Sequence, residues 1–414
     1  MSLNPLDSLP RLLSDFRRPS GIIKADYEDF VVEEQPLYPA DGVGPHTYFL
    51  LEKRGLTTLQ AIADVARALG VPRRQIGYAG MKDARAVSRQ WMSVEHVAPE
   101  KLLALELPRL RVLEVTRHRN KLRLGHLRAN RFEIKLRDTD VGRLAELRSA
   151  LATLARLGIP NYFAQQRFGA RGDAWLIGRH ILAGDIPAAM DQLLGKPGPA
   201  DYGDIRRARQ LYEAGDYAAA ANAWPAMFRD ERRALKALAR SKGKATRGFA
   251  AIDRSLRSFY VSAYQSYLFN QVVAARLPSG LGRLCDGDLA WIHGREAVFL
   301  VESAEAEQPR ADALEISPTG PLFGYRMTEP QRSPGELERQ LLEREGLTPD
   351  SFRAGKLRVK GARRPLRFAV SDADISLGAD DRGAYLLLRF TLPRGCYATA
   401  LLRELFDLTE PTSD

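Results

Sequence analysis

The pattern of apolar and polar positions predicts strands near both ends of the chain. Residues 29–34 are rich in β-branched side chains, residues 47–53 are aromatic and apolar, and residues 384–392 form the apolar run of a buried strand. Residues 36–45 are rich in Pro and Gly and are expected to form a loop between the first two strands. The two ends of the chain are therefore strand-rich.

Residues 117–137 form the most basic stretch, with eight Lys or Arg residues against the single acid Glu133. Apolar and charged positions alternate in it, which predicts a pair of strands with one apolar and one charged face. The apolar face would carry Leu122, Leu124, Phe132, Ile134 and Leu136, and the charged face Arg131, Glu133, Lys135 and Arg137. The charged face suits either a phosphate backbone or plain solvation, and both interpretations stay open.

Helical patterns dominate the middle of the chain, from residue 173 to about residue 363. Helices are predicted there at residues 182–194, 206–214, 217–228, 231–240 and 263–277, separated by Gly and Pro breaks. The basic residues 241–248 are expected to form a flexible loop that either binds RNA or is solvated. Further helices are predicted at residues 57–69, 143–157 and 397–405.

Composition narrows the class of protein. The 414 residues suffice for two domains, or for one domain with a large insertion. The net charge of +11 favours a polyanionic partner, nucleic acid ahead of an anionic membrane. Cys285 and Cys396 form no CxxC pair and no zinc-like cluster with the six histidines, so we expect a reducing cytoplasm and no structural metal. No signal peptide and no membrane span are expected.

Residues 77–94 carry the strongest candidate for chemistry. Gly77 and Gly80 precede Lys82 and Asp83 on a loop between a helix and a strand, where a carboxylate beside a cation suits a nucleophile. An ordinary surface turn would have the same composition, so this alternative stays open. The stretch contains neither GxxxxGK[ST] nor GxGxxG, which disfavours a nucleotide-phosphate loop and an RNA methyltransferase.

The stretch GMKD at residues 80–83, followed by Ala86, Ser88, Gln90 and Trp91, resembles the signature of the TruD family of tRNA pseudouridine synthases. The family pattern is G-x-K-D and then A-x-T-x-Q-W, and Ser88 keeps the hydroxyl of the usual Thr. Other stretches similar to the family lie in the expected order along the chain: residues 42–46 before this motif, and residues 130–132, 160–169 and 393–405 after it. The resemblance runs from about residue 20 to residue 408.

The resemblance implies an α+β fold: a pseudouridine synthase core of mixed, mainly antiparallel strands, interrupted by an inserted α+β TruD-type domain. The first part of the catalytic domain would span residues 1–158, the inserted domain residues 159–363, and the last part of the catalytic domain residues 364–414. The chemistry would convert uridine to pseudouridine in tRNA, at uridine 13 in the family. The family further implies no cofactor and no metal, and we expect a monomer.

By the same resemblance, Asp83 would be the nucleophile and Lys24 the cation that keeps it ionised. Asn130 would fix the Asp83 loop, and Phe132 would stack on the flipped uracil. From the alternation alone Phe132 would be a core aromatic residue, and the two roles are compatible if the apolar face borders the active cleft. Candidate RNA contacts are Lys82, Arg131, Asn161 and Arg167. The alternative is a basic RNA-binding or RNA-remodelling protein without catalysis.

Overall fold

The computed structural model describes residues 5–353 and 358–410. The chain divides into two compact units, each built from two separate stretches of sequence. The sheet unit comprises Arg11–Ile159 and Phe368–Asp414, and the helical unit comprises Met1–Pro10 and Pro160–Arg367. The domain limits expected from the sequence stay a prediction.

The sheet unit contains most of the strands of the chain. Its strands are β1 (Ser20–Ile22), β2 (Phe30–Pro36), β3 (His46–Arg54), β4 (Gly77–Tyr78), β5 (Val87–Glu95), β6 (Leu110–His118), β7 (Leu127–Leu136), β14 (Ser371–Asp380), β15 (Gly383–Pro393) and β16 (Asp407–Thr409). Its helices are α1 (Thr58–Leu69), α2 (Pro99–Leu103), α3 (Leu144–Leu157) and α13 (Ala398–Leu405).

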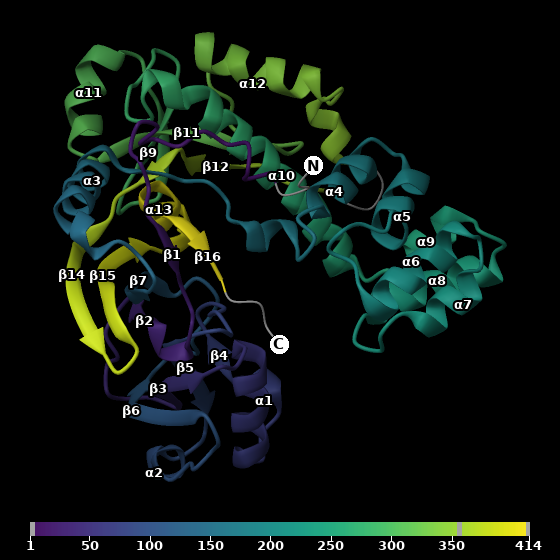
Figure 1. Ribbon diagram of the computed structural model, residues 1–414, viewed down its shortest axis with the longest axis horizontal. Helices are drawn as coiled ribbons and strands as arrows, with labels where there is room; N and C mark the ends of the chain where they lie inside the picture. Colours follow the sequence, from purple (N-terminus) through teal and green to yellow (C-terminus); the bar gives the residue numbers. More distant parts are fainter. Residues whose placement is uncertain (1–4, 354–357, 411–414) are drawn as a thin grey trace. The chain divides into compact units, whose positions relative to one another are not determined.

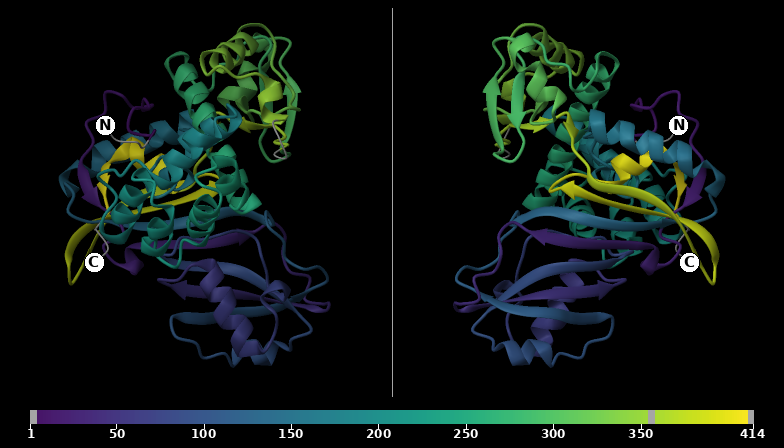
Figure 2. Two further views of the ribbon diagram at one scale, coloured as in Figure 1. Left: turned by 90° about the vertical axis from the view of Figure 1, so that its right-hand side faces the viewer. Right: turned by 90° about the vertical axis from the view of Figure 1, so that its left-hand side faces the viewer.

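Eight of these strands form one mixed sheet in the order β14-β15-β7-β2-β5-β3-β6, with β4 paired to β5 (Figure 1). All neighbours are antiparallel except β2 and β5, which are parallel. Strands β14 and β15, which come from the C-terminal stretch of this unit, therefore extend a sheet whose other strands come from the first 136 residues, and both views in Figure 2 show them beside β7. The α+β class expected from the sequence is confirmed.

The register aligns side chains across the middle of this sheet. Phe132 on β7 lies between Phe390 on β15 and Val32 on β2, and Val32 in turn pairs with Ser88 on β5. Ser88 pairs with Lys53 on β3. Cross-strand partners lie about 4.5–5.5 Å apart at Cβ. The row of paired residues therefore extends from Phe390 and Phe132 in the apolar core to Ser88 and Lys53, near the Asp83 loop.

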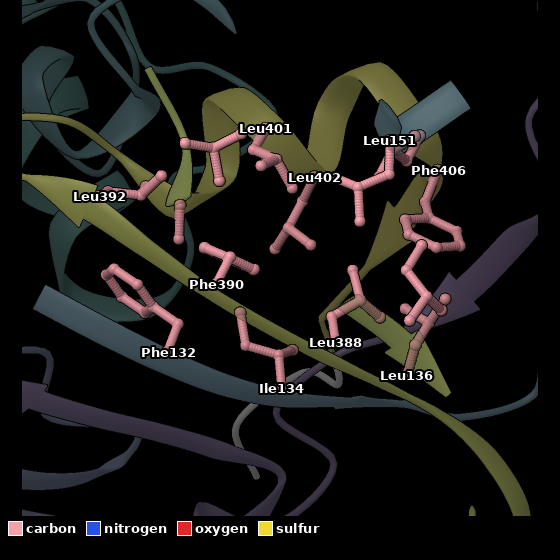
Figure 3. Packing of buried hydrophobic residues seen from close by; sticks show 14 of the residues in the cluster. Phe132, Ile134, Leu136, Leu151, Leu388, Phe390, Leu392, Leu401, Leu402 and Phe406 are labelled. Atoms are coloured by element: carbon pink, nitrogen blue, oxygen red, sulfur yellow. The ribbon is translucent and has the colours of Figure 1, made fainter. Parts of the chain in front are cut away.

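Two hydrophobic clusters hold the sheet unit together. One packs β7 and β15 against α3 and α13, and Figure 3 shows side chains of these four elements pointing toward one another, with Phe132 at one end. The other packs α1 against β3 and β5 through residues such as Val65, Phe49 and Met92. Thr57 caps α1 in a reciprocal capping box with Gln60, which explains why this helix begins where the sequence predicts.

The helical unit contains nine helices and four strands among its described residues. The helices are α4 (Ala174–Leu182), α5 (Ile186–Leu194), α6 (Gly203–Glu213), α7 (Tyr217–Ala223), α8 (Arg229–Arg240), α9 (Ala245–Ala250), α10 (Arg254–Arg276), α11 (Ala304–Asp312) and α12 (Arg332–Arg344). The strands are β9 (Leu289–Ile292), β10 (Ala297–Leu300), β11 (Ile316–Leu322) and β12 (Ala362–Pro365), in the order β10-β9-β11-β12. The short strands β8 (Ile159–Pro160) and β13 (Arg367–Phe368) contain two of the three points where the chain passes from one unit to the other, and the third lies between Pro10 and Arg11.

Helix α10 forms the centre of the helical unit. It buries residues on most of its circumference, including Tyr264, Leu268 and Phe269. A helix that is apolar on nearly all sides must be covered on nearly all sides, and α10 packs against both α4 and β11. No helix in the described part of the chain is long and apolar enough to cross a membrane.

Several predicted elements differ from those observed. The prediction of two strands within the basic residues 117–137 is wrong for the first strand. Strand β6 ends at His118, and residues 119–126 form a loop in which Leu124 is exposed. The backbone of this loop bonds to neighbouring segments in place of a ladder, and Gly125 has a left-handed φ of 88°.

In the helical unit, the predicted helix at residues 182–194 is interrupted at Gly184, which has a φ of 75°. The helix predicted to reach residue 228 ends at Ala223, because Trp224 precedes Pro225 and residues before proline avoid the helical region. The loop expected at residues 241–248 is wrong for its second half, because helix α9 begins at Ala245. Gly248 in this helix is buried, and a Cβ there would lie 2.8 Å from Leu238.

Candidate active site

Asp83 lies on the loop between β4 and β5, and its carboxylate is held at both oxygens. Oδ2 accepts a hydrogen bond from Lys24 Nζ at 2.7 Å, and Oδ1 accepts one from the backbone N–H of Arg85 at 3.1 Å. The side chain nevertheless remains 23% exposed. The loop thus presents a carboxylate of defined orientation that a substrate can still reach, as a nucleophile requires.

Lys24 is a buried cation in a strained backbone conformation. The residue is 4% exposed, and its φ of 56° lies in the left-handed region that residues other than glycine avoid. Such a conformation costs on the order of 1–3 kcal/mol and persists only where surrounding contacts impose it. Here Nζ bonds to Asp83, pairs with Glu410 at 3.2 Å and lies 4.9 Å from the centre of the Phe30 ring.

Lys53 holds the backbone of the Asp83 loop. Its ammonium group is buried and donates to the backbone carbonyls of Leu56 at 2.6 Å and Asp83 at 2.7 Å, and to Ser88 Oγ at 3.3 Å. Burial lowers the pKa of Lys53 to about 8, although the nearby Asp83 carboxylate opposes the shift. Lys53 therefore holds the backbone of the proposed nucleophile with a cation that titrates near neutral pH.

Thr58 and Gln90 hold the start of the same loop. The Thr58 hydroxyl accepts from the backbone N–H of Lys82 at 2.9 Å and donates to Gln90 Oε1 at 2.9 Å. Gln90 Nε2 in turn donates to the Gly80 carbonyl at 3.3 Å. Both side chains are buried, and a buried polar network with satisfied members rigidifies its surroundings. The loop that bears Asp83 is thus fixed to α1 and β5.

Lys82, the residue before Asp83, points into the protein. Its ammonium forms a 2.6 Å ion pair with Glu34, and both side chains are almost fully buried. Burial raises the pKa of Glu34, and the charge of Lys82 works against that shift. The charge of Lys82 is matched inside the sheet unit, and the expected RNA contact of Lys82 stays a prediction.

Asn130 and Phe132 lie two residues apart on β7, so their side chains share one face of the sheet. Asn130 pairs in register with Glu34, and its buried Oδ1 has no hydrogen-bond partner among the described residues. Phe132 is 8% exposed, stacks on Phe390 at 5.2 Å and meets the edge of Phe30 at 6.0 Å. The expected core position of Phe132 is confirmed, and its stacking on a base stays a prediction.

The sequence candidates thus fall into two groups. Lys24, Lys82, Asp83, Asn130 and Phe132 are linked in the sheet unit by direct contacts or through Phe30 and Glu34. Arg131 is in the same unit, but its side chain points to the opposite face of β7 and is half-exposed near Glu133.

Asn161 and Arg167 belong to the helical unit and have internal partners there. Asn161 is 1% exposed, donates to the Pro365 carbonyl at 2.8 Å and accepts from Arg364. Arg167 donates to the hydroxyls of Ser262 and Ser266. Both side chains are therefore engaged within the helical unit, and an RNA contact by either residue stays a prediction.

Sequence reasoning missed Glu34 and Lys53, although the strand pattern contains a signal for both. Glu34 continues the buried phase of Phe30 and Val32 on β2, and Lys53 continues that of Leu51 on β3. A charged residue in the buried phase of a strand must be paired inside the protein or serve a site. Both residues lie near the end of their strand and reach the Asp83 loop.

Comparison with known proteins gives one consistent family. The family model for tRNA pseudouridine synthase D (TruD) matches residues 10–405. A protein named tRNA pseudouridine synthase D from Geobacter sulfurreducens is 47% identical over 385 residues, which is 93% of this chain and 93% of that protein. One of the same name from Anaeromyxobacter dehalogenans is 37% identical over 402 residues, or 97% of both chains.

The fold agrees with these sequence matches. A crystal structure from Methanosarcina mazei, named as a tRNA pseudouridine synthase D (TruD), superposes with a TM-score of 0.82 at 25% identity and covers 98% of both chains. Sequence and structure therefore match the same family over nearly the full length. The chain belongs to the tRNA pseudouridine synthase D (TruD) family.

Proposed function

We propose that this protein isomerises uridine to pseudouridine in tRNA, that its target is uridine 13, and that Asp83 is the nucleophile. Family membership supports the reaction class. The observation that carries the role of Asp83 is the Lys24–Asp83 contact of 2.7 Å on a loop whose backbone Lys53 also holds. A buried cation favours the ionised form of a carboxylate, and only that form can attack.

The reaction needs no net change of atoms. The N1–C1′ bond of uridine breaks, the uracil rotates, and a bond forms between C5 and C1′. The proton on C5 leaves and N1 gains one, so the product is an isomer of the substrate. Attack by an Asp83 oxygen on the ribose or on the base would both create a covalent intermediate that allows the uracil to rotate.

The surrounding residues would serve to position the reactants. Lys24 keeps the carboxylate charged and oriented, and Lys53 keeps the loop from shifting. Asn130 has a buried amide oxygen with no hydrogen-bond partner among the described residues, and its role would be to fix the Asp83 loop. Phe132 would pack on the face of a uracil taken out of its stack.

The test maps pseudouridine in unmodified tRNA transcripts after incubation with wild type, Asp83→Asn or Asp83→Ala. Pseudouridine is located by carbodiimide-dependent stops of reverse transcription. We expect a stop at uridine 13 with wild type, and a rate lower by about 10³-fold or more for both variants, because a nucleophile has no substitute. Retained tRNA affinity would assign the loss to chemistry.

Asp64→Asn serves as the matched control. Asp64 is on α1, has a 35% exposed side chain and pairs only with Arg67 among the described residues, so its loss of charge should leave the rate unchanged. Stops that persist with Asp83→Asn would move the nucleophile to another residue. Tight tRNA binding without any stop in wild type would favour the non-catalytic RNA-binding alternative.

A further inference from the structure

A cationic pocket of about 600 Å³ opens on the sheet unit, where β6 ends and the loop of residues 119–126 begins. Three imidazoles line it, from His46, His118 and His126, and three cationic side chains, from Arg119, Lys121 and Arg123. No carboxylate is among its described lining residues. Such a concave surface attracts an anion, because every ionisable group that lines it is either positive or neutral.

The cations of this pocket are available to a ligand to different degrees. Arg123 is exposed. The side chain of Arg119 is 73% exposed and lies 3.4 Å from Asp41, a surface pair that contributes little. Lys121 donates to the backbone carbonyl of Arg74 at 2.5 Å, which leaves its charge uncompensated. The pocket therefore keeps a net positive charge after its internal contacts are counted.

Some imidazole nitrogens of the pocket are hydrogen-bonded, and at least one has no partner among the described residues. His46 is 8% exposed, and its Nδ1 has no partner among the described residues. His126 shares a 2.7 Å hydrogen bond with the Tyr38 hydroxyl, and His118 stacks between Tyr38 and Tyr48. No group of His, Cys, Asp and Glu in the described chain is arranged to hold a metal ion. The described lining of the pocket thus offers positive charge and aromatic ring surface, but no metal site.

The loop that forms the pocket is bonded directly to the segment that leads to Asp83. The N–H of Gly125 donates to the Ala79 carbonyl at 2.8 Å, and the N–H of Leu122 donates to Ser93 Oγ at 3.0 Å. A ligand held in the pocket would therefore be held by the same rigid part of the sheet unit as the proposed nucleophile.

A second, more apolar pocket of about 300 Å³ adjoins the first and shares Tyr38 and His126 with it. Tyr48 and Trp91 are among its other walls. Aromatic walls beside a cationic groove are the combination with which proteins hold a nucleic-acid strand, since bases stack on rings while phosphates contact cations. This neighbourhood favours a polynucleotide over a free anion.

We propose that the pocket at residues 119–126 binds the phosphodiester backbone of the tRNA substrate, a contact that rests on the proposed function. It would supply affinity and orientation without reading sequence, because phosphates are alike in every nucleotide. Neutralised phosphates release counterions, so the contact must also appear in the salt dependence of binding.

The experiment compares tRNA affinity of wild type with that of Arg119→Gln/Arg123→Gln, measured by fluorescence anisotropy over a range of salt concentrations. The charge-matched control is Lys101→Gln/Arg111→Gln, two exposed residues near the opposite end of β6. Arg111 and His118 are separated by roughly 20 Å along the strand. We expect the pocket variant to bind about three- to tenfold more weakly, with a salt slope smaller by about one to two. The control should stay close to wild type.

Equal affinities and equal salt slopes for the two double variants would overturn the proposal. Inorganic phosphate serves as a second probe: phosphate binding that the pocket variant loses, with unchanged tRNA affinity, would assign the site to a small anion and also overturn it. Pseudouridine formation by wild type is measured in the same preparations. Its absence would count against the proposed function, while the comparison of salt slopes would still decide for or against the pocket.

Discussion

Lys53 is a buried charge that contacts the loop of the proposed nucleophile without a role in the proposed bond changes. Its ammonium group has no exposed surface and contacts the backbone of Asp83, while Lys24 contacts the carboxylate itself. The two lysines therefore have different roles: Lys53 positions the main chain of Asp83, and Lys24 positions its side chain. A lysine buried in this way resists protonation, and its pKa falls to about 8.

This lowered pKa predicts opposite pH trends for activity and for stability. Above about pH 8 the folded protein loses the charge on Lys53 that holds Asp83, so kcat should decline through that pH. Between about pH 8 and the ordinary lysine value near 10.5, the unfolded chain binds more protons than the folded one. The contribution of Lys53 to the free energy of unfolding should therefore rise with pH over this window.

Pseudouridine rates and urea unfolding, each measured from about pH 7 to pH 10, check this prediction with wild type and Lys53→Met. The methionine variant should lack both the alkaline decline in kcat and the Lys53 contribution to the pH dependence of stability. Identical pH profiles for the two proteins would show that Lys53 does not titrate in this range.

Strand β4 contributes only two residues, yet it places the Asp83 loop against the loop of residues 119–126. Gly77 makes this approach possible: a Cβ there would lie 2.3 Å from the Leu122 carbonyl oxygen and 2.6 Å from Ser93 Oγ. Gly80 also precedes Asp83 in the same segment. Its backbone is not left-handed, however, and a Cβ would meet no atom closer than 3.6 Å.

The two glycines therefore predict different tolerance to alanine. Gly77→Ala should lower the free energy of unfolding by about 1–3 kcal/mol, since the added methyl group meets backbone that cannot retract without moving a neighbouring segment. Gly80→Ala should change it by less than about 1 kcal/mol, because its neighbours are at ordinary contact distance. Urea denaturation of both variants measures this difference, and an equal loss in the two would contradict the assignment of the close contact to Gly77.

Arg137 connects distant parts of the chain within the sheet unit. It donates to both oxygens of Asp29, 108 residues away, and to both oxygens of Asp380, 243 residues away. Asp29 is 1% exposed and Arg137 is 7% exposed, so neither charge can turn to water if its partner is lost. The network joins the N-terminal and C-terminal stretches of this unit at β7.

Removal of this arginine should therefore destabilise the sheet unit as a whole. Arg137→Leu removes both charge-assisted hydrogen bonds to the buried Asp29 carboxylate, which keeps only the Asp26 N–H at 3.1 Å and Arg382 at 4.0 Å, and should cost about 3–5 kcal/mol. The exposed pair of Arg389 and Glu133, at 3.6 Å, supplies the comparison, and Arg389→Leu should cost less than about 1 kcal/mol. Chemical denaturation of the two variants checks the prediction, which fails if the losses are similar.

Much of this arrangement could be predicted from local sequence patterns. Runs of β-branched, aromatic and apolar residues predicted β2, β3 and β15, and the alternation of apolar and charged positions predicted β7 and the core position of Phe132, because side chains of a strand alternate between its two faces. The motif at residues 80–91 identified Asp83 and, by family resemblance, Lys24, which the structure brings to 2.7 Å from each other.

Other features depend on contacts between residues far apart in the chain. Periodicity placed Leu122 and Leu124 on a strand, but bonds to Ser93 and Ala79 make that segment a loop. The role of the charges on Glu34 and Lys53 follows only from the register of β2, β3 and β5, which brings both side chains to the Asp83 loop. A local pattern describes the faces of an element, whereas pairing, register and buried charge contacts arise when separate elements pack together.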